Sequence, residues 1–337
     1  MRPWVFLLLL VIEVSGAAER LATQRPYKRG EAMAGYKRPA IPFPEDNRYS
    51  REREALGRKL FFDPRLSGAR NTSCATCHNP GLAWGDGLAR AIGAGGKPLR
   101  RRTPTILNSG WGDLMFWDGR AESLEEQVLG PMQSADEMNL PLRELVPRVL
   151  SIPGYRPLFE KAYPGAPLTA ALVAKAIATF ERTVVSEDAP FDRWIGGDQA
   201  AIPEAAKRGF DLFHTKAGCS KCHLGWTFTD EGFHDIGTTG PDRGRGMLLP
   251  LEAMQHAFKT PGLREIDLRG PYMHDGAETT LEDVVEFYDL GGRVKRPGLS
   301  PEIVPLRLTA AEKQDLIAFL HTLTGPTRLV EYPVLPH

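Results

Sequence analysis

The apolar residues of this chain recur at the spacing of helices rather than in the alternation of strands. The pattern is clearest in residues 168–185, where one helical face would carry Leu172, Val173, Ile177 and Phe180. A helical stretch also leads from Tyr49 into Leu56-Gly57-Arg58-Lys59-Leu60-Phe61-Phe62. Because no run of residues has a convincing strand pattern, the sequence predicts a mainly α fold.

The last predicted helix has recognisable signals at both ends. Thr309 and Glu312 have the spacing of a capping box, and the pair Gly325-Pro326 is a typical stop. The apolar stripe between these signals consists of Leu316, Ile317, Leu320 and Leu323. Outside the helices, we expect residues 19–48, which are rich in Pro, Lys and Arg, to form an extended arm on the surface. Residues 327–337 are expected to form an extended tail.

A short pattern occurs twice and indicates a duplicated unit. Gly57-Arg58-Lys59-Leu60-Phe61 and Gly209-Phe210-Asp211-Leu212-Phe213 share a Gly-x-x-Leu-Phe spacing, and each precedes a pair of cysteines. This repetition predicts two similar helical domains in tandem, over residues 49–188 and 189–326. At 337 residues, the chain is long enough for two compact domains with ample core.

The cysteine pairs carry the strongest chemical signal. Cys74-Ala75-Thr76-Cys77-His78 and Cys219-Ser220-Lys221-Cys222-His223 are both Cys-x-x-Cys-His, the pattern that attaches a c-type haem. The thiols bond to the haem vinyl groups, and the histidine coordinates the iron. Two disulfides or one four-cysteine zinc site are the alternatives, but neither needs a histidine after each pair. Since these motifs use all four cysteines, the sequence predicts two covalently bound haems.

Charge and the first residues indicate where the protein acts. The 42 Lys and Arg residues balance the 42 Asp and Glu residues, which argues against nucleic acid as a partner. Residues 1–18 have the form of an export signal, with Arg2, an apolar run over residues 4–12, and the small residues Ser15-Gly16-Ala17-Ala18 at a cleavage site. A membrane anchor is the alternative, but the run is short for a span and Glu13 follows it. We therefore expect a periplasmic protein without an anchor in its mature form.

The chemistry of each haem depends on whether its iron has a sixth ligand. A fully ligated c-type haem passes electrons, whereas an open face can bind peroxide or oxygen. After His78 the next histidine is His214, so the first half offers only methionines as further ligands. These are Met115, Met132 and Met138, and no spacing favours one of them. The residues alone leave an open and a closed first haem as alternatives.

Further motifs, in order along the chain, resemble the bacterial di-haem cytochrome c peroxidase and MauG superfamily. They are Arg102-Thr103-Pro104-Thr105-Ile106-Leu107-Asn108, Phe116-Trp117-Asp118-Gly119-Arg120-Ala121, Leu124-Glu125-Glu126-Gln127, Gly130-Pro131, Glu137-Met138, Phe258-Lys259-Thr260-Pro261 and Pro271-Tyr272-Met273-His274-Asp275-Gly276. The resemblance covers nearly the whole mature chain. It implies a peroxide-reactive haem in the first cytochrome c-like domain and an electron-transfer haem in the second.

The resemblance implies roles for four residues beside the first haem. Glu137 matches the distal-pocket glutamate that handles protons during O–O cleavage, a step that needs a base. Gln127 and Pro131 match residues that line the same pocket. Trp117 matches the tryptophan placed between the two haems, where an indole can relay electrons. Considered without the family, Glu137 would be a solvated surface acid and Trp117 a core aromatic residue.

The sixth ligand of the second haem distinguishes the branches of the superfamily. The resemblance implies a methionine in the peroxidases, fourteen residues beyond the histidine of a Pro-Tyr-x-His motif, and a tyrosine in MauG-type members. Counting from His274 reaches Tyr288. A core tyrosine is the alternative, because Tyr288 shares a helical face with Leu281, Val284 and Val285. An anionic phenolate favours ferric and higher iron, which suits the storage of oxidising equivalents.

Two departures from the family pattern concern the first haem and calcium. Residues 79–99 lack the distal histidine with which many peroxidases of the family close their first haem, so the resemblance implies a haem that is ready for peroxide without prior reduction. Arg102 stands where members commonly have an asparagine that binds calcium between the domains. A cation cannot bind calcium, which leaves only the carbonyls of Arg269 and Pro271 for that ion. The basic run 97–102 could pair with haem propionates or dock a partner.

Another departure concerns the transfer of oxidising equivalents to a partner protein. Ala217 stands where MauG has a surface tryptophan, so Trp226 and Trp111 become the candidates for an exit. The leading hypothesis is an enzyme that reacts with hydrogen peroxide to form a high-valent di-haem state. It would then oxidise tryptophan, or another aromatic residue, of a secreted partner protein, as MauG or MbnH does.

Two other functions remain as alternatives. One is a peroxidase that detoxifies hydrogen peroxide with electrons from a small cytochrome or copper protein. The other is a plain electron-transfer cytochrome, against which an open first haem and Glu137 both argue.

Overall fold

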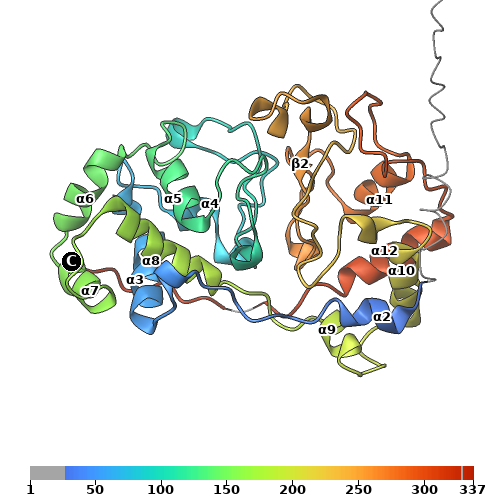
Figure 1. The fold of residues 1–337 in the computed structure, drawn as a ribbon, viewed down its shortest axis with the longest axis horizontal. Coiled ribbons are helices and arrows are strands. Elements are labelled where there is room, and N and C mark those ends of the chain that lie inside the picture. Colours follow the sequence, from blue (N-terminus) through green and yellow to red (C-terminus); the bar gives the residue numbers. More distant parts are fainter. Residues whose placement is uncertain (1–26, 328) are drawn as a thin grey trace, which may run out of the picture.

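The computed structural model describes residues 27–327 and 329–337, which form two helical lobes side by side (Figure 1). The first lobe holds α3 (Arg51–Phe62), α4 (Cys74–Cys77), α5 (Leu124–Gln133), α6 (Leu142–Leu150), α7 (Tyr155–Ala162) and α8 (Ala170–Arg182). The second lobe holds α9 (Pro190–Ile195), α10 (Glu204–His214), α11 (Leu281–Asp289) and α12 (Ala310–His321). The predicted mainly α fold is confirmed.

Each lobe is built on one pair of closely packed helices. In the first lobe α3 packs against α8, and a Cβ atom added at Gly57 would lie 1.8 Å from the carbonyl oxygen of Ala176. In the second lobe α10 packs against α12, and a Cβ atom at Gly209 would lie 1.9 Å from the carbonyl oxygen of Asp315. Real Cβ atoms do not approach so closely, so only glycine allows these backbones to touch. The repeated Gly-x-x-Leu-Phe pattern thus has the same packing task in both lobes.

The buried apolar residues separate into two main clusters that follow the sequence. One cluster runs from Leu56 to Val184, and the other combines Tyr36 with residues between Phe191 and Leu323. The expected boundary between residues 188 and 189 falls between these clusters. As the limit of two independent domains it stays a prediction.

Helix α12 begins as the sequence predicts but ends earlier. The Glu312 N–H donates to Thr309 Oγ1 at 3.3 Å, and the Thr309 N–H donates to Glu312 Oε2 at 2.7 Å, which completes the capping box. The helix ends at His321, before the predicted stop at Gly325-Pro326. Gly325 instead donates its N–H to Glu265 Oε2 at 2.9 Å, so the chain has already left the helix to contact a neighbouring segment.

The prediction of an arm that is extended over residues 19–48 is wrong in one segment. Helix α2 (Arg29–Ala34) forms there, and Ala32 and Met33 pack against the core of the second lobe. Tyr36 is only 3% exposed. With six residues, α2 is too short to show helical periodicity, and tertiary contacts rather than local sequence stabilise it. The predicted export signal, residues 1–18, lies outside the described residues.

Strand structure is minimal, as expected. Strands β1 (Phe233–His234) and β2 (Phe258–Lys259) form one antiparallel pair in which Phe233 faces Lys259. This pair belongs to the part of the second lobe that faces the first. Among residues 27–327 and 329–337, no helix is long and apolar enough to cross a membrane.

The C-terminal tail leaves the second lobe and returns to the first. Arg65 donates to the carbonyl oxygen of Pro336 at 2.8 Å, and the Gly154 N–H donates to the carbonyl oxygen of His337 at 2.7 Å. Tyr332 packs edge-on against Phe62 with ring centroids 4.9 Å apart. The tail is therefore extended, as the sequence predicts, but it is held along its length.

Candidate haem-binding site

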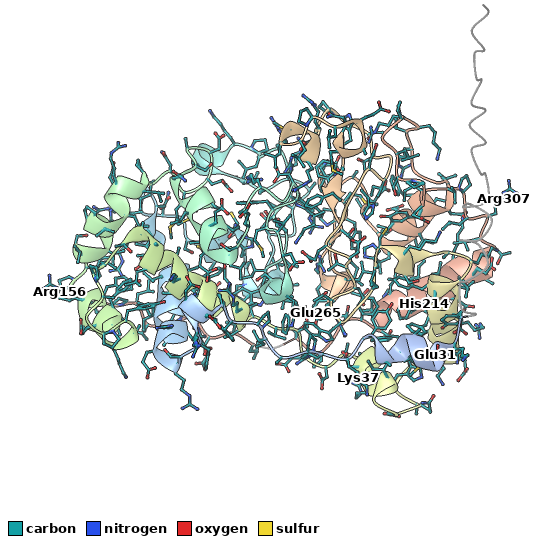
Figure 2. All side chains as sticks on the ribbon, viewed as in Figure 1. Glu31, Lys37, Arg156, His214, Glu265 and Arg307 are labelled. Carbon is teal, nitrogen blue, oxygen red and sulfur yellow. The ribbon has the colours of Figure 1, made fainter. Side chains whose placement is uncertain are left out.

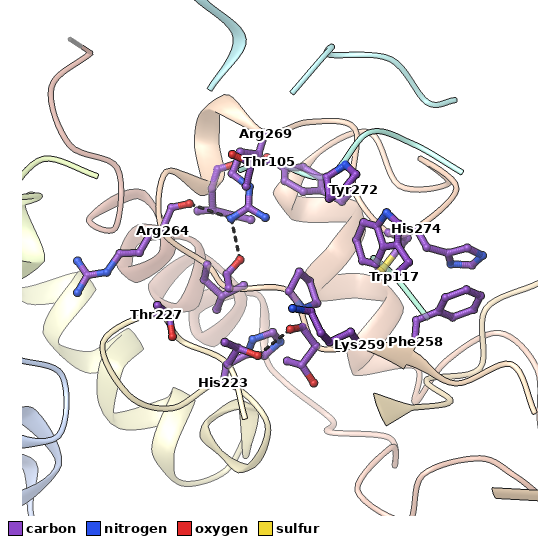
Figure 3. A pocket seen from close by; sticks show the side chains of 18 of the residues that line it. Thr105, Trp117, His223, Thr227, Phe258, Lys259, Arg264, Arg269, Tyr272 and His274 are labelled. Atoms are coloured by element: carbon purple, nitrogen blue, oxygen red, sulfur yellow. Dashed lines mark hydrogen bonds between the residues drawn. The ribbon is translucent and has the colours of Figure 1, made fainter. Parts of the chain in front are cut away.

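A single cleft lies between the facing sides of the two lobes and holds both histidines of the Cys-x-x-Cys-His motifs. His78 lines it from the first lobe and His223 from the second. Most of the other lining side chains are apolar, among them Ile106, Leu107, Met115, Phe116, Leu124, Phe258, Leu263, Ile266, Leu281, Val284 and Ile303. Figure 3 shows part of this lining, with His223, Trp117 and Arg269 on different sides of the space.

The first motif sits on a single turn of helix. Helix α4 spans the two cysteines, and the Ser73 N–H donates to Thr76 Oγ1 at 3.0 Å where the turn begins. Nδ1 of His78 lies 3.2 Å from the carbonyl oxygen of Trp84. If this nitrogen carries the proton, Nε2 keeps its lone pair for a metal. Burial lowers the pKa of His78, so its imidazole is neutral, as a ligand must be.

The second motif repeats this arrangement with a different turn. Gly218 has a φ of 64°, which directs the chain into the short 3₁₀ turn Cys219–Lys221. Nδ1 of His223 lies 2.9 Å from the carbonyl oxygen of Phe228, so Nε2 is again the nitrogen left for a metal. Burial also lowers the pKa of His223. The two histidines are thus oriented in the same way by backbone carbonyls.

The four thiols fit attachment to a haem better than disulfide formation. No disulfide joins Cys74, Cys77, Cys219 and Cys222, although each pair is only three residues apart. Burial, the largest cause, raises the pKa of Cys77 to about 11 and that of Cys219 to about 12. Such thiols remain protonated and are poor zinc ligands until they ionise.

Arginines around the cleft have nitrogens without acceptors, which fit the carboxylates that a haem carries, although Arg264 also pairs with Asp192 through Nη1 at 2.6 Å. Arg102 Nε and Arg264 Nη2 are buried and have no hydrogen-bond partner among the described residues. Both arginines line the cleft, together with the half-buried Arg269. Burial is the largest cause that lowers the pKa of Arg269, to about 10, and repulsion by Arg102 adds to it. A haem propionate would supply the missing acceptors and the missing negative charge. The sequence did not reveal Arg264 or Arg269, because charge alone does not show that a guanidinium is buried.

The candidate sixth ligands differ in their placement. Tyr288 lines the cleft beside the second motif, and burial raises its pKa, with the nearby Cys219 and Cys222 adding to the effect. In the first lobe Met115 lines the cleft, whereas Met132 and Met138 lie in the hydrophobic core. His234 and His274 also line the cleft.

The residues expected beside the first haem are only partly brought to the cleft. Trp117 and Gln127 line it, and the Trp117 indole N–H donates to the carbonyl oxygen of Arg102 at 3.1 Å. Pro131 lies inside α5 and Glu137 follows that helix, and neither is among the lining residues. Glu137 is half-buried, and burial raises the pKa of its carboxyl group. The charge of Glu137 is one cause of the raised pKa of Cys77, so Glu137 lies on the side of the first motif.

Arg102 occupies the place that the sequence comparison assigned to a calcium ligand. Its Nη2 donates to the carbonyl oxygen of Arg269 at 2.7 Å, across the two lobes. This carbonyl is one of the two that were left for calcium. The guanidinium therefore takes up an oxygen that the ion would need, and calcium binding stays a prediction without support.

One group of side chains has metal-ligand spacing but fits the haem site instead. Ligand atoms of Cys222, Asp230 and His234 lie within 4.8 Å of one another. His234 Nε2 lies 2.8 Å from Asp230 Oδ2, a distance that a hydrogen bond explains. Because a thioether to haem would use the sulfur of Cys222, this group does not define a separate metal centre.

The two tryptophans proposed as an exit contact each other. The rings of Trp111, from the first lobe, and Trp226, from the second, have centroids 4.4 Å apart. Trp226 is buried with an unpaired indole N–H, while Trp111 is partly exposed and donates to the carbonyl oxygen of Ala40 at 3.2 Å. Guanidinium groups of Arg38 and Arg264 lie 5.0 and 5.2 Å from the Trp226 ring. Ala217 is buried and lines the cleft.

Comparison with known proteins defines the class. The model of the family "Di-haem cytochrome c peroxidase" matches residues 51–200. The chain belongs to this family of di-haem oxidoreductases, and it carries two covalently bound c-type haems. The predictions of the family, the enzyme class and the haems are confirmed.

The similarity extends along nearly the whole chain to particular members. The chain is 49% identical to methylamine utilization protein MauG of Methylorubrum extorquens, over 97% of this chain and 94% of that protein. It is 45% identical to the protein of the same name from Methylophilus methylotrophus, over 89% and 91% of the two chains. A solved structure of a MauG-like protein associated with microbial copper homeostasis superposes with a TM-score of 0.79 at 35% identity, covering 86% of this chain and 93% of that one.

Proposed function

We propose that this protein is a periplasmic enzyme that uses hydrogen peroxide to oxidise tryptophan, or another aromatic residue, of a secreted partner protein. The observation that carries the proposal is the placement of Tyr288, a half-buried phenol that lines the cleft beside the second motif. A tyrosine ligand favours ferric and higher iron, whereas the thioether of a peroxidase favours the reduced state. The 45–49% identity to two MauG proteins supports the same branch.

In this proposal the two motifs and the cleft residues hold the haems. Cys74 and Cys77 attach the first haem and His78 binds its iron, while Cys219 and Cys222 attach the second, with His223 and Tyr288 as its iron ligands. When bound, the haems supply the reaction with peroxide and store its oxidising equivalents. Arg102, Arg264 and Arg269 offset the charge of the propionates.

The side chains near the first motif move protons and exclude water. Glu137 accepts a proton from peroxide and returns it to the leaving oxygen, and its raised pKa makes that return easier. Gln127, which lines the cleft, and Pro131, which lies inside α5, are the residues assigned to the space around that carboxyl group. Trp117, fixed by its hydrogen bond to Arg102, lies between the lobes, where an indole can pass electrons.

The experiment uses the holoenzyme and any small secreted protein that a neighbouring gene is found to encode. Mass spectrometry of that protein after exposure to enzyme and peroxide should show added oxygen or a crosslink at tryptophan. An unchanged mass in the presence of active enzyme would reject the proposal.

The second candidate is a scavenger of peroxide, which the family description favours. It would turn over peroxide rapidly with a reduced small cytochrome or copper protein as donor. Fast steady-state turnover of this kind, together with an unmodified partner, would select it.

A further inference from the structure

A surface pocket lies on the far side of one cleft residue. His274 lines both the haem cleft and this second pocket, which Arg90 and Arg100 reach from the first lobe and Arg243 and Met247 from the second. The His274 ring is stacked on Phe258 with centroids 3.6 Å apart, and Phe258 also lines the cleft. His274 is 5% exposed, so one buried ring separates the pocket from the cleft. Figure 3 shows His274 and Phe258 together beyond Trp117.

An exposed apolar segment adjoins this pocket. Met247, Leu248, Leu249 and Leu251 are 54%, 46%, 41% and 61% exposed, and no other run of four large apolar side chains in five described residues is as open. Isolated exposed apolar residues are ordinary, but a contiguous group with a polar rim is typical of a surface that binds another protein. Arg100 joins the segment to the first lobe, because its Nη1 lies 3.2 Å from the sulfur of Met247.

Three arginines flank this segment, beside one exposed acid, Glu252, next to Leu251. Arg90, Arg100 and Arg243 are exposed, and none of the three forms an ion pair within the described part of the chain. The neighbouring carboxylate of Asp242 is already neutralised by Arg101, which donates to it at 2.7 and 3.0 Å. Asp275 is the remaining acidic group of the pocket. We call Met247, Leu248, Leu249, Leu251, Arg90, Arg100 and Arg243 the interlobe surface.

We propose that the interlobe surface docks the partner protein, and that the partner's contact face has an apolar centre rimmed by carboxylates. This inference rests on the proposed function, since it assigns the place where that partner binds. Charge complementarity indicates which kind of protein face binds here. Guanidinium groups without ion-pair partners around apolar side chains attract an acidic face and repel a basic one. The location fits a protein that exchanges electrons with the haems, because a protein bound here is separated from the haem cleft only by the side chain of His274.

The test measures binding of an acidic probe protein to the holoenzyme. The probe is ¹⁵N-labelled plastocyanin, a small copper protein with an acidic patch, and NMR line broadening gives its Kd. The triple variant Arg90→Gln/Arg100→Gln/Arg243→Gln should raise the Kd by about 10-fold at low ionic strength, and the difference should shrink in 0.5 M salt. The double variant Leu249→Ser/Leu251→Ser should raise the Kd at both salt concentrations. A basic cytochrome c as probe should bind the triple variant no more weakly than the wild type.

Matched controls come from the outer end of the first lobe. Arg156, labelled there in Figure 2, is an exposed arginine, and Leu150 is 48% exposed. Arg156→Gln and Leu150→Ser should leave the Kd unchanged. A triple variant that binds plastocyanin as tightly as the wild type would overturn the proposal. So would sedimentation showing a wild-type dimer that the variants abolish, because the surface would then pair two copies of this chain.

A further measurement keeps this inference separate from the proposed function. Peroxide turnover with hydroquinone, a small neutral donor, needs no docked protein and should be the same in the wild type and all variants. Unchanged turnover with an unchanged Kd rejects the docking surface alone. Loss of partner oxidation in the triple variant, with hydroquinone turnover intact, is the result that supports it.

Discussion

The two haem motifs are alike in how their histidines are oriented and unlike in the other side chains around them. Each histidine is oriented by a backbone carbonyl, and each motif follows a helix that packs through a glycine. Around the second motif the structure adds a half-buried phenol, Tyr288, whereas residues 49–188 contain no histidine besides His78 and place one methionine, Met115, on the cleft. Duplication thus accounts for attachment, and the chemistry of each site depends on the few residues that the copies do not share.

We expect the largest effect from substitutions of Tyr288, the residue that distinguishes the second haem site from the first. Tyr288→Phe should convert a ferric protein with one high-spin and one low-spin haem into one with two high-spin haems, because no side chain replaces the phenol. Tyr288→Met should raise the potential of the second haem, since a thioether replaces phenolate. Partner oxidation should fall to background in both variants. Electron paramagnetic resonance and redox titration give the readouts.

The control for this prediction is a tyrosine that lies outside the cleft. Tyr155 is fully buried in the first lobe and donates to Asp63 Oδ2 at 2.8 Å. Tyr155→Phe should leave both haem spectra unchanged. If the Tyr288 variants also retain the low-spin signal, Tyr288 is a core residue, and the result favours the second candidate function, a peroxidase that scavenges peroxide.

A second prediction tests the proton chemistry assigned to the first site. Glu137→Gln should slow the reaction with peroxide by about 10²- to 10⁴-fold, because the amide cannot accept a proton. Burial raises the pKa of Glu137, so the wild-type rate should fall as the pH drops through a pKa above 4.5, and the variant should lack this decline. Stopped-flow absorbance measures both. The exposed Glu144 in α6 supplies the control, since Glu144→Gln should keep the rate and its pH dependence.

A third prediction tests the feature that the lobes share. Gly57→Ala and Gly209→Ala should each lower the free energy of unfolding by about 1–3 kcal/mol, because the new methyl group meets a backbone carbonyl. Urea denaturation followed by circular dichroism measures the change. Gly30 in α2 has open space around it, so Gly30→Ala should be neutral or slightly stabilising. Tolerance of alanine at one site but not the other would show that the lobes are packed differently.

The smallest expected effect concerns calcium. Because the Arg102 guanidinium already holds the carbonyl oxygen of Arg269, dialysis against EGTA should change neither the haem spectra nor the midpoint of thermal unfolding. Arg102→Asn removes this cation and should lower the midpoint, and added calcium should restore part of the loss. A wild-type protein that loses stability in EGTA would show that an ion binds beside Arg102.

The helices that the sequence predicted are those in which apolar periodicity and local signals agree. Helices α8 and α12 were expected from apolar spacing, and Thr309 caps α12 as its capping box indicates. Helix α3 was expected as a helical stretch, and α10 only through the repeated Gly-x-x-Leu-Phe pattern. Helix α2 was not predicted, because six residues are too few to show the apolar periodicity of a helix. The stop at Gly325 was misplaced because the glycine serves a contact with Glu265 rather than the end of the helix.

The site was predictable in its covalent part and less so in its surroundings. A motif of five residues specifies two thiols and a histidine wherever it occurs, so the attachment residues follow from local sequence. The contact of Trp111 with Trp226 and the bond from Arg102 to Arg269 join the two lobes. No local spacing encodes such pairs, because they depend on how the folded halves meet.

The return of the C-terminal tail has a consequence for how the protein is made and handled. Arg65 and Gly154 bind residues 336 and 337, so the first lobe gains these contacts only after the second lobe has been synthesised. An affinity tag fused after His337 would extend from the packed surface of the first lobe, far from the helix that precedes the tail. A tag of this kind would disturb the first lobe, although the tail follows the second lobe in sequence.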